Sequence, residues 1–497
     1  MQMRILSKSK LMALRQCPRR LWLEVHQREL RRDPPSSEAR FAVGDLVGEL
    51  ARSLYDPDEN GQFVDIDVLG VEGGIEHTAA LLDKRVPVFE AGLQGGGARA
   101  FVDVLRPTRK GSARTWDLIE VKSSASLKGS HRDDVAIQSY VARSAGLPLS
   151  AVKVAYVDTS FVYKGHDDYQ SLLREVDLTQ DAESRQREVA DWIAEGQAVA
   201  DLPEMPVTQT GLQCRTPHRC GFLDYCRTLE APVEFPVQWM PRLQGSLREH
   251  VRSQGIRDLR DLPDPLLSPQ QLRVKTQTLS GLAYFDRAGA QAELADVCWP
   301  ALFLDFEAVQ LAVPIWVGAR PYQMFPFQFS LHTLTQDGSL NHAEYLDLSG
   351  EEPARRFAEA LLALVPMEGT VFVWNASFEQ SQIRALAARF ADLRGPLQSL
   401  EARLFDLLKV VETRYYHPAQ KGSWKLKRVL PTLVPDLDHA ALTEVNDGHM
   451  AVLAYTEAVQ PDTPAERRAE LDRALRAYCA MDTEALVRIW QALRNPG

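Results

Sequence analysis

The sequence lacks several features that mark familiar protein classes. It has only six cysteines in 497 residues, a formal net charge of -10, and no apolar run long enough to cross a bilayer. The opening residues show no apolar core followed by a small-residue cleavage site, so we expect no signal peptide. These absences argue against a disulfide-stapled secreted protein, a membrane protein, and a protein that coats nucleic acid through its overall charge. We expect a cytoplasmic protein.

The length and the local patterning predict a multidomain α/β protein, since one hydrophobic core rarely serves so long a chain. Residues 1–228 show helical segments around a short β region. Residues 229–298 are richer in proline and polar residues and predict a helical connector of short helices. Residues 299–497 alternate apolar strands with long helices, which predicts a second α/β domain.

Two local basic tracks contrast with the acidic overall charge. One lies in the first 32 residues, and the other lies in the stretch "KGSWKLKRVL". Such tracks are compatible with a nucleic-acid enzyme and equally with two solvated surfaces. Their members are Lys8, Lys10, Arg15, Arg19, Arg20, Arg28, Arg31 and Arg32 in the first track, and Lys421, Lys425, Lys427 and Arg428 in the second.

The first group of candidate site residues lies in "RAFVDVLRPTRKGSARTWDLIEVKSS". A predicted strand carries Asp103, and the next strand carries Glu120 and Lys122. Residues two apart on a strand share a face, so Glu120 and Lys122 project together, and Asp103 joins them if the strands pair. Two carboxylates form a hard oxygen site for Mg²⁺ or Mn²⁺, and a lysine can stabilise developing negative charge. An exposed hairpin with ordinary charges is the alternative.

This arrangement resembles the PD-(D/E)XK nuclease superfamily, which has a restriction-endonuclease-like core. In that superfamily an Asp ends one strand, a Glu-x-Lys lies on the next, and a helix carrying Gln and Tyr follows. The helix "HRDDVAIQSYVARSAG" matches it with Gln138, while Tyr140 departs from the usual spacing. Related enzymes often add a His ligand from an early helix, where this chain has Gly48 and Glu49. The resemblance implies Asp103 and Glu120 as metal ligands and catalytic residues, with Lys122 and Gln138 also catalytic.

Three cysteines occur within thirteen residues, in "CRTPHRCGFLDYC". Cys214, Cys220 and Cys226 are separated by five residues each, whereas structural zinc sites usually use pairs two to four apart. In a reducing compartment, clustered cysteines are more often metal ligands or reactive thiols than disulfides. The best fourth ligand is Cys17, which lies upstream of the first group of site residues.

The cysteine arrangement resembles the iron-sulfur nucleases of the RecB-like group, including AddB and the CRISPR-associated exonucleases. In them one early cysteine and three late ones hold the nuclease domain closed. The resemblance implies a 4Fe-4S cluster on Cys17, Cys214, Cys220 and Cys226. Zinc in the same place and a redox-sensing cluster remain alternatives.

Acidic residues recur on three predicted elements of the C-terminal region. Asp305 and Glu307 are two apart on the strand "LFLDFEAV", so both carboxylates point the same way. Glu379 begins a helix after the strand "TVFVWN". Tyr478 and Asp482 are four apart on the last helix and therefore neighbours on its surface. Buried together, these carboxylates would repel one another unless divalent cations were bound, so the pattern predicts a two-metal site.

These motifs resemble the DEDD exonucleases of the RNase H-like fold, also called DnaQ-like. Their Asp-x-Glu motif matches Asp305 and Glu307, and their tyrosine-subtype Tyr-x-x-x-Asp motif matches Tyr478 and Asp482. Their Asn-x-x-Phe-Asp motif matches "NASFE", with Glu379 in place of Asp. The resemblance implies that the four carboxylates bind Mg²⁺ or Mn²⁺ and that Tyr478 orients or deprotonates the attacking water. Asp406 is a possible substitute ligand, with helix capping as its alternative role.

Most of the chain resembles a largely uncharacterised bacterial family that fuses these two nuclease-like halves. The resemblance implies a metal-dependent phosphodiester hydrolase with two sites, and DNA is the favoured partner, as single strands or ends. An RNA-directed exonuclease is one alternative. A nucleic-acid-binding scaffold with one or both sites inactive is another, favoured by Gly48 and Glu379 at positions where the families carry His and Asp. Protein partners do not follow from the sequence.

Overall fold

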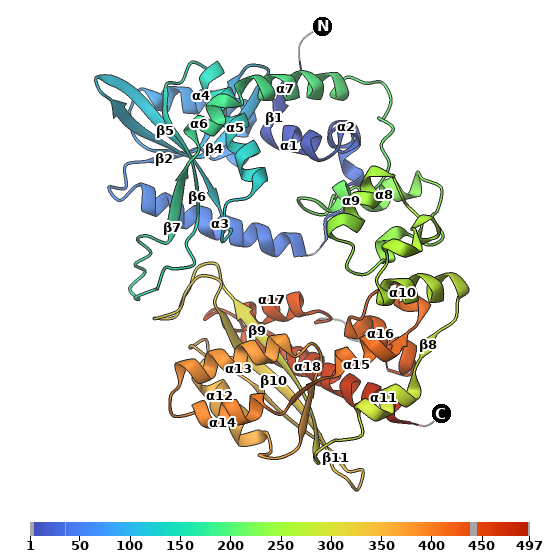
Figure 1. Cartoon of the computed structure of the whole chain (residues 1–497). Helices are drawn as coiled ribbons and strands as arrows, with labels where there is room; N and C mark the ends of the chain where they lie inside the picture. The colour runs from blue at the N-terminus through green and yellow to red at the C-terminus, as the bar shows by residue number, and fades with distance from the viewer. Residues whose placement is uncertain (1–3, 35, 438–444, 496–497) are drawn as a thin grey trace. The chain divides into compact units, whose positions relative to one another are not determined.

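The computed structural model describes residues 4–34, 36–437 and 445–495. Helices and strands alternate along the chain (Figure 1), and the predicted multidomain α/β class is confirmed. The chain divides into two compact units. Unit 1 consists of Met1–Pro232 with Leu311–Gln323, and unit 2 consists of Val233–Gln310 with Met324–Gly497.

The two units differ from the predicted domains in two respects. The region predicted as a separate connector, residues 229–298, falls almost wholly within unit 2. The segment Leu311–Gln323, predicted inside the C-terminal domain, belongs to unit 1 although its neighbours on both sides belong to unit 2. The chain therefore passes between the units three times, and a single cut cannot separate them.

Unit 1 is built on one mixed sheet of seven strands. The order is β2-β3-β4-β5-β6-β7, and β1 pairs with β4 beside the start of that strand. The pairs β3-β4 and β4-β5 are antiparallel, and β5-β6 is parallel. The strands are β1 Leu6–Ser7, β2 Gln62–Phe63, β3 Val88–Gly95, β4 Ala98–Lys110, β5 Ala113–Lys122, β6 Leu149–Val157 and β7 Leu173–Asp177.

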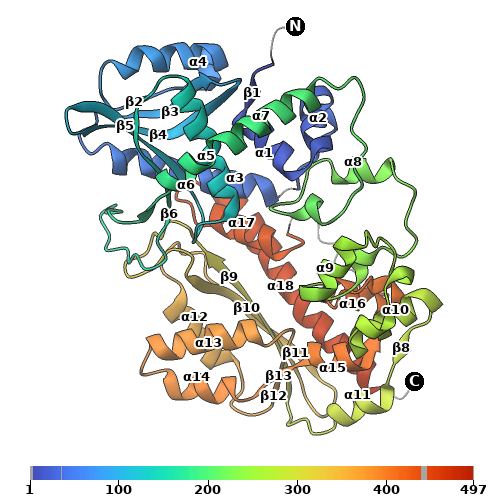
Figure 2. The same cartoon turned by 45° about the horizontal axis from the view of Figure 1, so that its top comes forward.

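Helices cover both faces of this sheet (Figure 2). Alternation along β5 shows the two faces: Leu118 packs in the cluster that contains α5, whereas the next residue, Ile119, packs with Tyr55 of α3. Successive strand residues point to opposite faces, so Glu120 shares the α5 face with Leu118. The helices are α1 Lys8–Gln16, α2 Pro18–His26, α3 Ser36–Tyr55, α4 Ile66–Leu82, α5 Gly129–Ser144, α6 Thr179–Ser184, α7 Gln186–Ala200 and α8 Leu223–Thr228.

The segment Leu311–Gln323 completes one part of the unit 1 core. Its Ala312 and Val313 are buried in a cluster with Val47 of α3 and Val157 of β6. Main-chain hydrogen bonds add to this packing: the Tyr163 N–H donates to the Ala319 carbonyl at 3.0 Å, and the Gly318 N–H donates to the Tyr163 carbonyl at 2.8 Å.

Unit 2 is built on a five-stranded sheet in the order β11-β10-β9-β12-β13. The strand β9 lies at the centre, antiparallel to β10 and parallel to β12, and β11 is antiparallel to β10. The strands of this unit are β8 Tyr284–Phe285, β9 Ala301–Gln310, β10 Met324–Leu334, β11 Leu340–Leu346, β12 Thr370–Val373, β13 Leu404–Asp406 and β14 Tyr415–Tyr416; β8 and β14 pair separately.

Aromatic residues pack the helices onto the two faces of the unit 2 sheet. On one face Phe303 of β9 stacks on Phe372 of β12 and meets Trp490 of α18 edge-on. On the other face Phe306 of β9 meets Phe357 of α12 edge-on. The helices are α9 Gly245–Ser253, α10 Pro269–Ser280, α11 Arg287–Glu293, α12 Ala354–Leu364, α13 Ser377–Arg389, α14 Arg394–Glu401, α15 Leu407–Arg414, α16 Leu426–Leu433, α17 Gly448–Ala458 and α18 Ala465–Arg494.

The predicted connector is helical and has a small core of its own, formed by Val237, Met240, Leu247, Val251, Leu259 and Leu262. Its helix α10 has strong local end signals. Ser268 and Gln271 form a capping box, Pro269 occupies the first turn, and Gly281 ends the helix at φ 72°. The Thr278 and Tyr416 hydroxyls are 2.8 Å apart, which ties α10 to β14 within unit 2.

We expect Phe303→Ala to destabilise unit 2 by about 3–5 kcal/mol, because it removes a fully buried ring packed between β12 and α18. Leu340→Ala is the matched control, since Leu340 is 46% exposed and its truncation should change stability by less than about 0.5 kcal/mol. Urea denaturation followed by tryptophan fluorescence measures both. Equal effects of the two substitutions would contradict this description of the core.

Candidate functional site

The N-terminal candidate residues predicted from sequence come together on the α5 face of the unit 1 sheet. Lys122 Nζ donates to Glu120 Oε1, and Gln138 Nε2 of α5 donates to Glu120 Oε2 at 2.5 Å. The Val121 N–H donates to Asp103 Oδ2 at 2.6 Å, which ties the β4 carboxylate to β5. Glu120 is 2% exposed and Gln138 is fully buried, whereas Asp103 and Lys122 are partly exposed.

Two further charged residues that the sequence did not assign to the site belong to the same network. Lys8, the first residue of α1, places Nζ 3.0 Å from Glu120 Oε1 and 3.0 Å from Asp134 Oδ1. Lys122 Nζ lies 2.7 Å from Asp134 Oδ2. Asp134 is only 7% exposed although it lies on a helix, where an acidic residue is usually solvated. Two lysines and two carboxylates therefore alternate around one point.

Glu90 is the third residue that sequence reasoning missed. It lies on β3 between the pairs Phe89↔Val104 and Ala91↔Val102, and so opposite Asp103. Its φ of 53° is in the left-handed region, which a non-glycine residue inside a strand rarely adopts. Burial, followed by the nearby Glu120 carboxylate, raises the pKa of Glu90. The sequence around Glu90 is that of an ordinary strand, so it does not indicate the positive φ of this residue.

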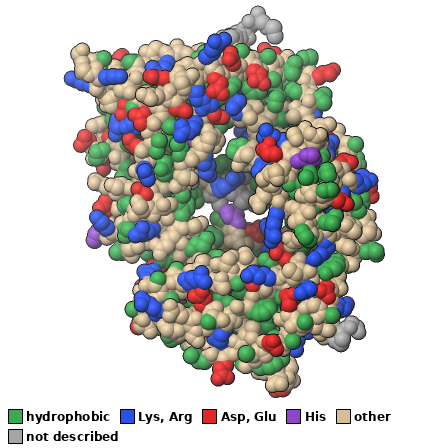
Figure 3. Space-filling model, in the orientation of Figure 1, with side chains coloured by type: hydrophobic (Ala, Val, Ile, Leu, Met, Phe, Trp, Pro, Cys, Tyr) green, Lys and Arg blue, Asp and Glu red, His purple; other side chains and the backbone are tan. Residues whose placement is uncertain are grey.

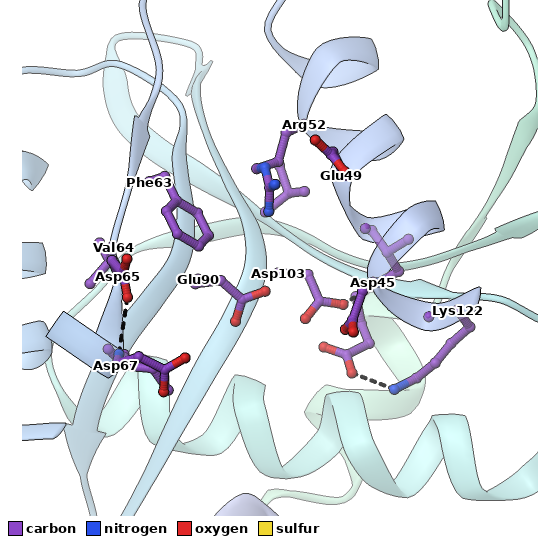
Figure 4. A pocket seen from close by; sticks show the side chains of 16 residues that line it. Asp45, Glu49, Arg52, Phe63, Val64, Asp65, Asp67, Glu90, Asp103 and Lys122 are labelled. Atoms are coloured by element: carbon purple, nitrogen blue, oxygen red, sulfur yellow. Dashed lines mark hydrogen bonds and ion pairs between the residues drawn. The ribbon is translucent and has the colours of Figure 1, made fainter. Parts of the chain in front are cut away.

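A cavity of about 550 Å³ opens onto Asp103, Glu120 and Lys122 (Figure 4). Glu90 lies beside Asp103 in this view, and α3 contributes Gly48 and Glu49 to the lining. A Cβ added at Gly48 would meet no atom within 4 Å, so this position faces open space. A larger side chain, such as the His expected from the resemblance, would have room here.

The charges of the N-terminal site are strongly coupled. Burial and the Glu120 carboxylate raise the pKa of Asp103 well above its usual range. Burial alone would raise the pKa of Asp134, but Lys8 and Lys122 hold it far below its usual range. Burial would lower the pKa of Lys122, yet Glu120 and Asp134 raise it. Both lysines thus stay charged and neutralise the largely buried carboxylates of Glu120 and Asp134.

Tyr140 lies outside this network. Its ring packs at the turn between β3 and β4, where a Cβ added at Gly96 would come within 2.4 Å of Tyr140 Cε1. Gln138 is therefore the residue of its helix that reaches Glu120.

The four candidate cluster cysteines converge on one region of unit 1. Cys17 lies between α1 and α2, at the cap of each helix. The neighbouring Gln16 amide donates to the carbonyls of Gln213, Thr216 and His218, at 2.8, 3.2 and 2.9 Å. These bonds join the end of α1 to the loop that carries the late cysteines.

The late cysteines are buried free thiols, with Cys214, Cys220 and Cys226 between 6 and 8% exposed. The Cys220 N–H donates to the Cys214 carbonyl at 2.8 Å. Burial raises the pKa of all three thiols, that of Cys226 to about 11. No three of the described cysteine and histidine side chains lie within 4.8 Å of one another, whereas thiolates on one zinc ion would be about 3.8 Å apart.

The C-terminal candidate residues form the tightest acidic group in the described part of the chain. Asp305 and Glu307 of β9 and Asp482 of α18 have ligand atoms that all lie within 4.8 Å of one another. Alternation along β9 explains this, because Asp305 and Glu307 share the face on which Phe303 meets α18. One strand and one helix that are distant in sequence thus supply three convergent carboxylates.

Glu379, on the first turn of α13, is not part of that group but influences it. It is 1% exposed, and its Oε2 has no hydrogen-bond partner among the described residues. Burial, followed by the Asp406 carboxylate, raises the pKa of Glu379 to about 8. Asp406, the possible substitute ligand, accepts a hydrogen bond from the Asn375 N–H at Oδ1, at 3.2 Å. The backbone of Asn375 has a φ of 66°, in the left-handed region. An unpartnered buried carboxylate oxygen is suited to a cation.

Tyr478 lies beside the acidic group on α18 and is 5% exposed. Burial, followed by Asp482 and Glu307, raises the pKa of its phenol well above the usual range. Lys427 of α16 lies over the ring, with Nζ 4.8 Å from its centroid. Without bound cations the phenol therefore keeps its proton, and in this state Tyr478 can orient a water by hydrogen bonding.

Two carboxyl groups of the acidic group have pKa values well above the usual range, so they stay protonated to a higher pH. Burial and then Asp482 raise the pKa of Asp305 well above its usual range, and the same two causes raise that of Glu307 to about 8. Lys427 opposes both shifts. Carboxyls in this condition gain a large favourable interaction from a divalent cation.

The surface of the protein carries charges of both signs. Figure 3 shows Lys and Arg side chains interspersed with Asp and Glu over the visible face. In the residues that the structure describes, no helix combines the length and the apolar character needed to cross a membrane.

Comparison with known proteins gives a family match in the C-terminal half of the chain. Residues 302–425 are similar to the family described as Domain of unknown function (DUF2779). The matched segment includes Asp305, Glu307 and Glu379, and ends before Tyr478 and Asp482. No curated protein matches the chain.

In metal-free protein, we expect stability to fall as the pH rises from about 5 to about 8. The pKa values of Glu307 and Glu379 are raised to about 8, so the folded state keeps protons that the unfolded state releases from about pH 4.5 upward. The stability linked to those protons is present at low pH and is lost as the pH rises through 8. Thermal unfolding in EDTA at several pH values measures this loss.

The Tm should decrease less between pH 6 and pH 8 in Glu379→Gln than in the wild type, by about 3 °C or more, because the substitution removes one of these titrating groups. Glu368→Gln, at an exposed position of the same unit, should leave the fall unchanged. A pH profile that is the same in both variants would contradict the buried, protonated state of Glu379.

Proposed function

We propose that the protein is a metal-dependent nuclease with two hydrolytic sites, one in each unit. The observation that carries the proposal is the convergence of Asp305, Glu307 and Asp482 within 4.8 Å, because carboxylates this close repel one another and gain strongly from a bound divalent cation. The grouping of Asp103, Glu120 and Lys122 around a cavity supports the second site. Both resemblances noted in the sequence lead to the same reaction, hydrolysis of a phosphodiester bond.

In unit 1, Asp103 and Glu120 would hold Mg²⁺ or Mn²⁺, whose chemistry is to polarise the phosphate and activate a water. Their oxygen donors fit such hard cations. Lys122 projects from the same strand face as Glu120 and stabilises negative charge that develops on the phosphate. Gln138 holds the Glu120 carboxylate from the opposite side.

In unit 2, Asp305, Glu307, Glu379 and Asp482 would hold the cations. The unpartnered Oε2 of Glu379 and the raised pKa values of Asp305 and Glu307 support this ligand set. Tyr478 orients the attacking water through its protonated phenol. Glu379 has a longer side chain than the aspartate expected from the DEDD resemblance, so its carboxylate extends further from the main chain.

The four cysteines would hold a 4Fe-4S cluster with a structural role. Four thiols from both ends of unit 1 make a donor set that suits iron-sulfur binding, and a cubane spaces its thiolates more widely than one zinc ion does because each binds a different iron. Free thiols and a reducing cytoplasm agree with one another. The cluster would tie Cys17 to the late cysteines and so close the domain.

DNA is the favoured substrate, as single strands or ends. The resemblance to iron-sulfur nucleases supports DNA, and the basic residues flanking both sites suit a threaded phosphate backbone. Repair, recombination or defence would then be the cellular role. An RNA-directed exonuclease and a binding scaffold without catalysis are the competing functions.

End-labelled single-stranded DNA should be degraded by the wild type in Mg²⁺ or Mn²⁺ and not in EDTA. Asp103→Ala and Asp305→Ala each remove a metal ligand and should lower the rate of their own site by more than about 100-fold, since even outer-shell substitutions cost 10–100-fold. The double variant should lose both activities. Asp58→Ala and Glu368→Ala, both at exposed positions, are the matched controls.

The proposal fails if the wild type cleaves no single-stranded DNA, duplex DNA or RNA with either cation. Cleavage of RNA alone would favour the RNA-directed alternative. Cation-independent binding without cleavage would favour the scaffold.

Protein purified without oxygen should be brown, with broad absorption near about 400 nm. Cys17→Ser should abolish this absorption and destabilise unit 1, whereas Cys298→Ser, at an exposed position of unit 2, should change neither. Colourless wild-type protein with stoichiometric zinc would overturn the cluster. Oxidation that changes activity while the fold survives would indicate redox sensing in place of a structural role.

A further inference from the structure

Lys8 enters the N-terminal site from outside the two strands that carry its motif. The short strand β1 pairs with β4 at Leu6↔Ala98 and Ser7↔Arg99, which fixes the start of α1 beside the sheet. Ser7 caps α1 by accepting the Lys10 N–H at 3.3 Å. Lys8 is therefore fixed as the first residue of α1, and its ammonium group contacts Glu120 of β5 and Asp134 of α5.

Both oxygens of Glu120 accept hydrogen bonds. Oε1 accepts from Lys8 at 3.0 Å and also from Lys122, and Oε2 accepts from Gln138 at 2.5 Å. Asp134 binds the same two ammonium groups, at 3.0 Å from Lys8 and 2.7 Å from Lys122. Oε1 therefore accepts two hydrogen bonds and has no lone pair left, so a divalent cation that binds Glu120 through Oε1 must displace one of the two lysines.

Of the two lysines, Lys8 is better suited to release Glu120. Lys122 lies two residues from Glu120 on one strand, so alternation keeps the two side chains on one face. Lys8 belongs to a separate helix, so the shared strand that holds Lys122 beside Glu120 does not constrain it. Asp134 lies 3.0 Å from Lys8 and continues to neutralise it after Glu120 is released. The release of Lys8 from Glu120 therefore leaves neither charge unpaired once the cation is bound.

We propose that Lys8 is a positioning residue of the N-terminal site: its ammonium group holds Glu120 and Asp134 in place and is displaced from Glu120 by the divalent cation. This inference rests on the proposed function of unit 1. It adds to that function a competition between an internal cation and the metal ion. It also makes Asp134 the residue that retains Lys8 in the metal-bound protein.

The competition has a definite sign. Lys8 lies 3.0 Å from Glu120 and repels an incoming cation, so removal of its charge strengthens cation binding. A purely structural salt bridge between α1 and the sheet predicts something else: lower stability with unchanged cation affinity. Cation affinity, measured without substrate, therefore separates the two roles.

The experiment measures Mn²⁺ binding by isothermal titration calorimetry in the full chain carrying Asp305→Ala and Asp482→Ala, so that the unit 2 acidic group contributes little. In this background Lys8→Met keeps the length of the side chain and removes its charge. We expect Mn²⁺ to bind Lys8→Met about tenfold more tightly than the parent. Lys8→Arg retains the charge and should stay close to the parent.

Lys10→Met is the matched control, because it removes the same charge from the same helix. No ion pair of Lys10 with Glu120 or Asp134 occurs in the described part of the chain, and burial and the basic residues Arg99 and Arg4 lower its pKa. We expect Lys10→Met to bind Mn²⁺ as the parent does. If Lys8→Met does not fold, Lys8→Gln supplies a second uncharged variant that can still donate a hydrogen bond to Glu120.

Unchanged or weaker Mn²⁺ binding in folded Lys8→Met or Lys8→Gln overturns the inference. Tightening of equal size in Lys10→Met also overturns it, since the effect would then be a general one of charge. The proposed metal site of unit 1 has a separate test in the same background. If Asp103→Ala does not reduce Mn²⁺ binding, the proposed metal site of unit 1 is wrong.

Discussion

The burial of like charges is the constraint on which both candidate sites depend. Carboxylates withdrawn from water repel one another, and the protein meets this cost differently in its two units. In unit 1, Lys8 and Lys122 are interleaved with Glu120 and Asp134, so the charges are balanced within the chain. In unit 2, the compensation is largely by proton uptake, as the raised pKa of Glu307 indicates. The site of unit 1 thus offsets Glu120 and Asp134 with internal cations, whereas Lys427 does not offset the carboxyls of unit 2, whose pKa values stay raised.

Sequence reasoning succeeded where two residues share one element of regular structure. The spacing of two along a strand brought Glu120 beside Lys122 and Asp305 beside Glu307, and the α/β class followed from the same periodicities. The fixed geometry of strands allows such local inferences without any knowledge of the rest of the chain.

Lys8, Asp134 and Glu90 were not predicted as site residues, because their positions depend on contacts across the fold. Lys8 and Glu120 are 112 residues apart in sequence, and only the pairing of β1 with β4 brings them together. Asp134 reads as a solvated helix residue, and Glu90 depends on a positive φ that its flanking residues do not require. The assignment of Leu311–Gln323 to unit 1 likewise depends on contacts that are distant in sequence.

That segment bears on how the two halves can be exchanged between proteins. Leu311–Gln323 joins β9, which carries Asp305 and Glu307, to β10, yet its Ala312 and Val313 pack in the cluster that includes Val121, the residue between Glu120 and Lys122. A gene fragment that ends at residue 228 or 298 encodes a first half without this part of its own core. The halves are therefore not interchangeable cassettes, and a swap by recombination would have to carry the segment along with the domain it supports.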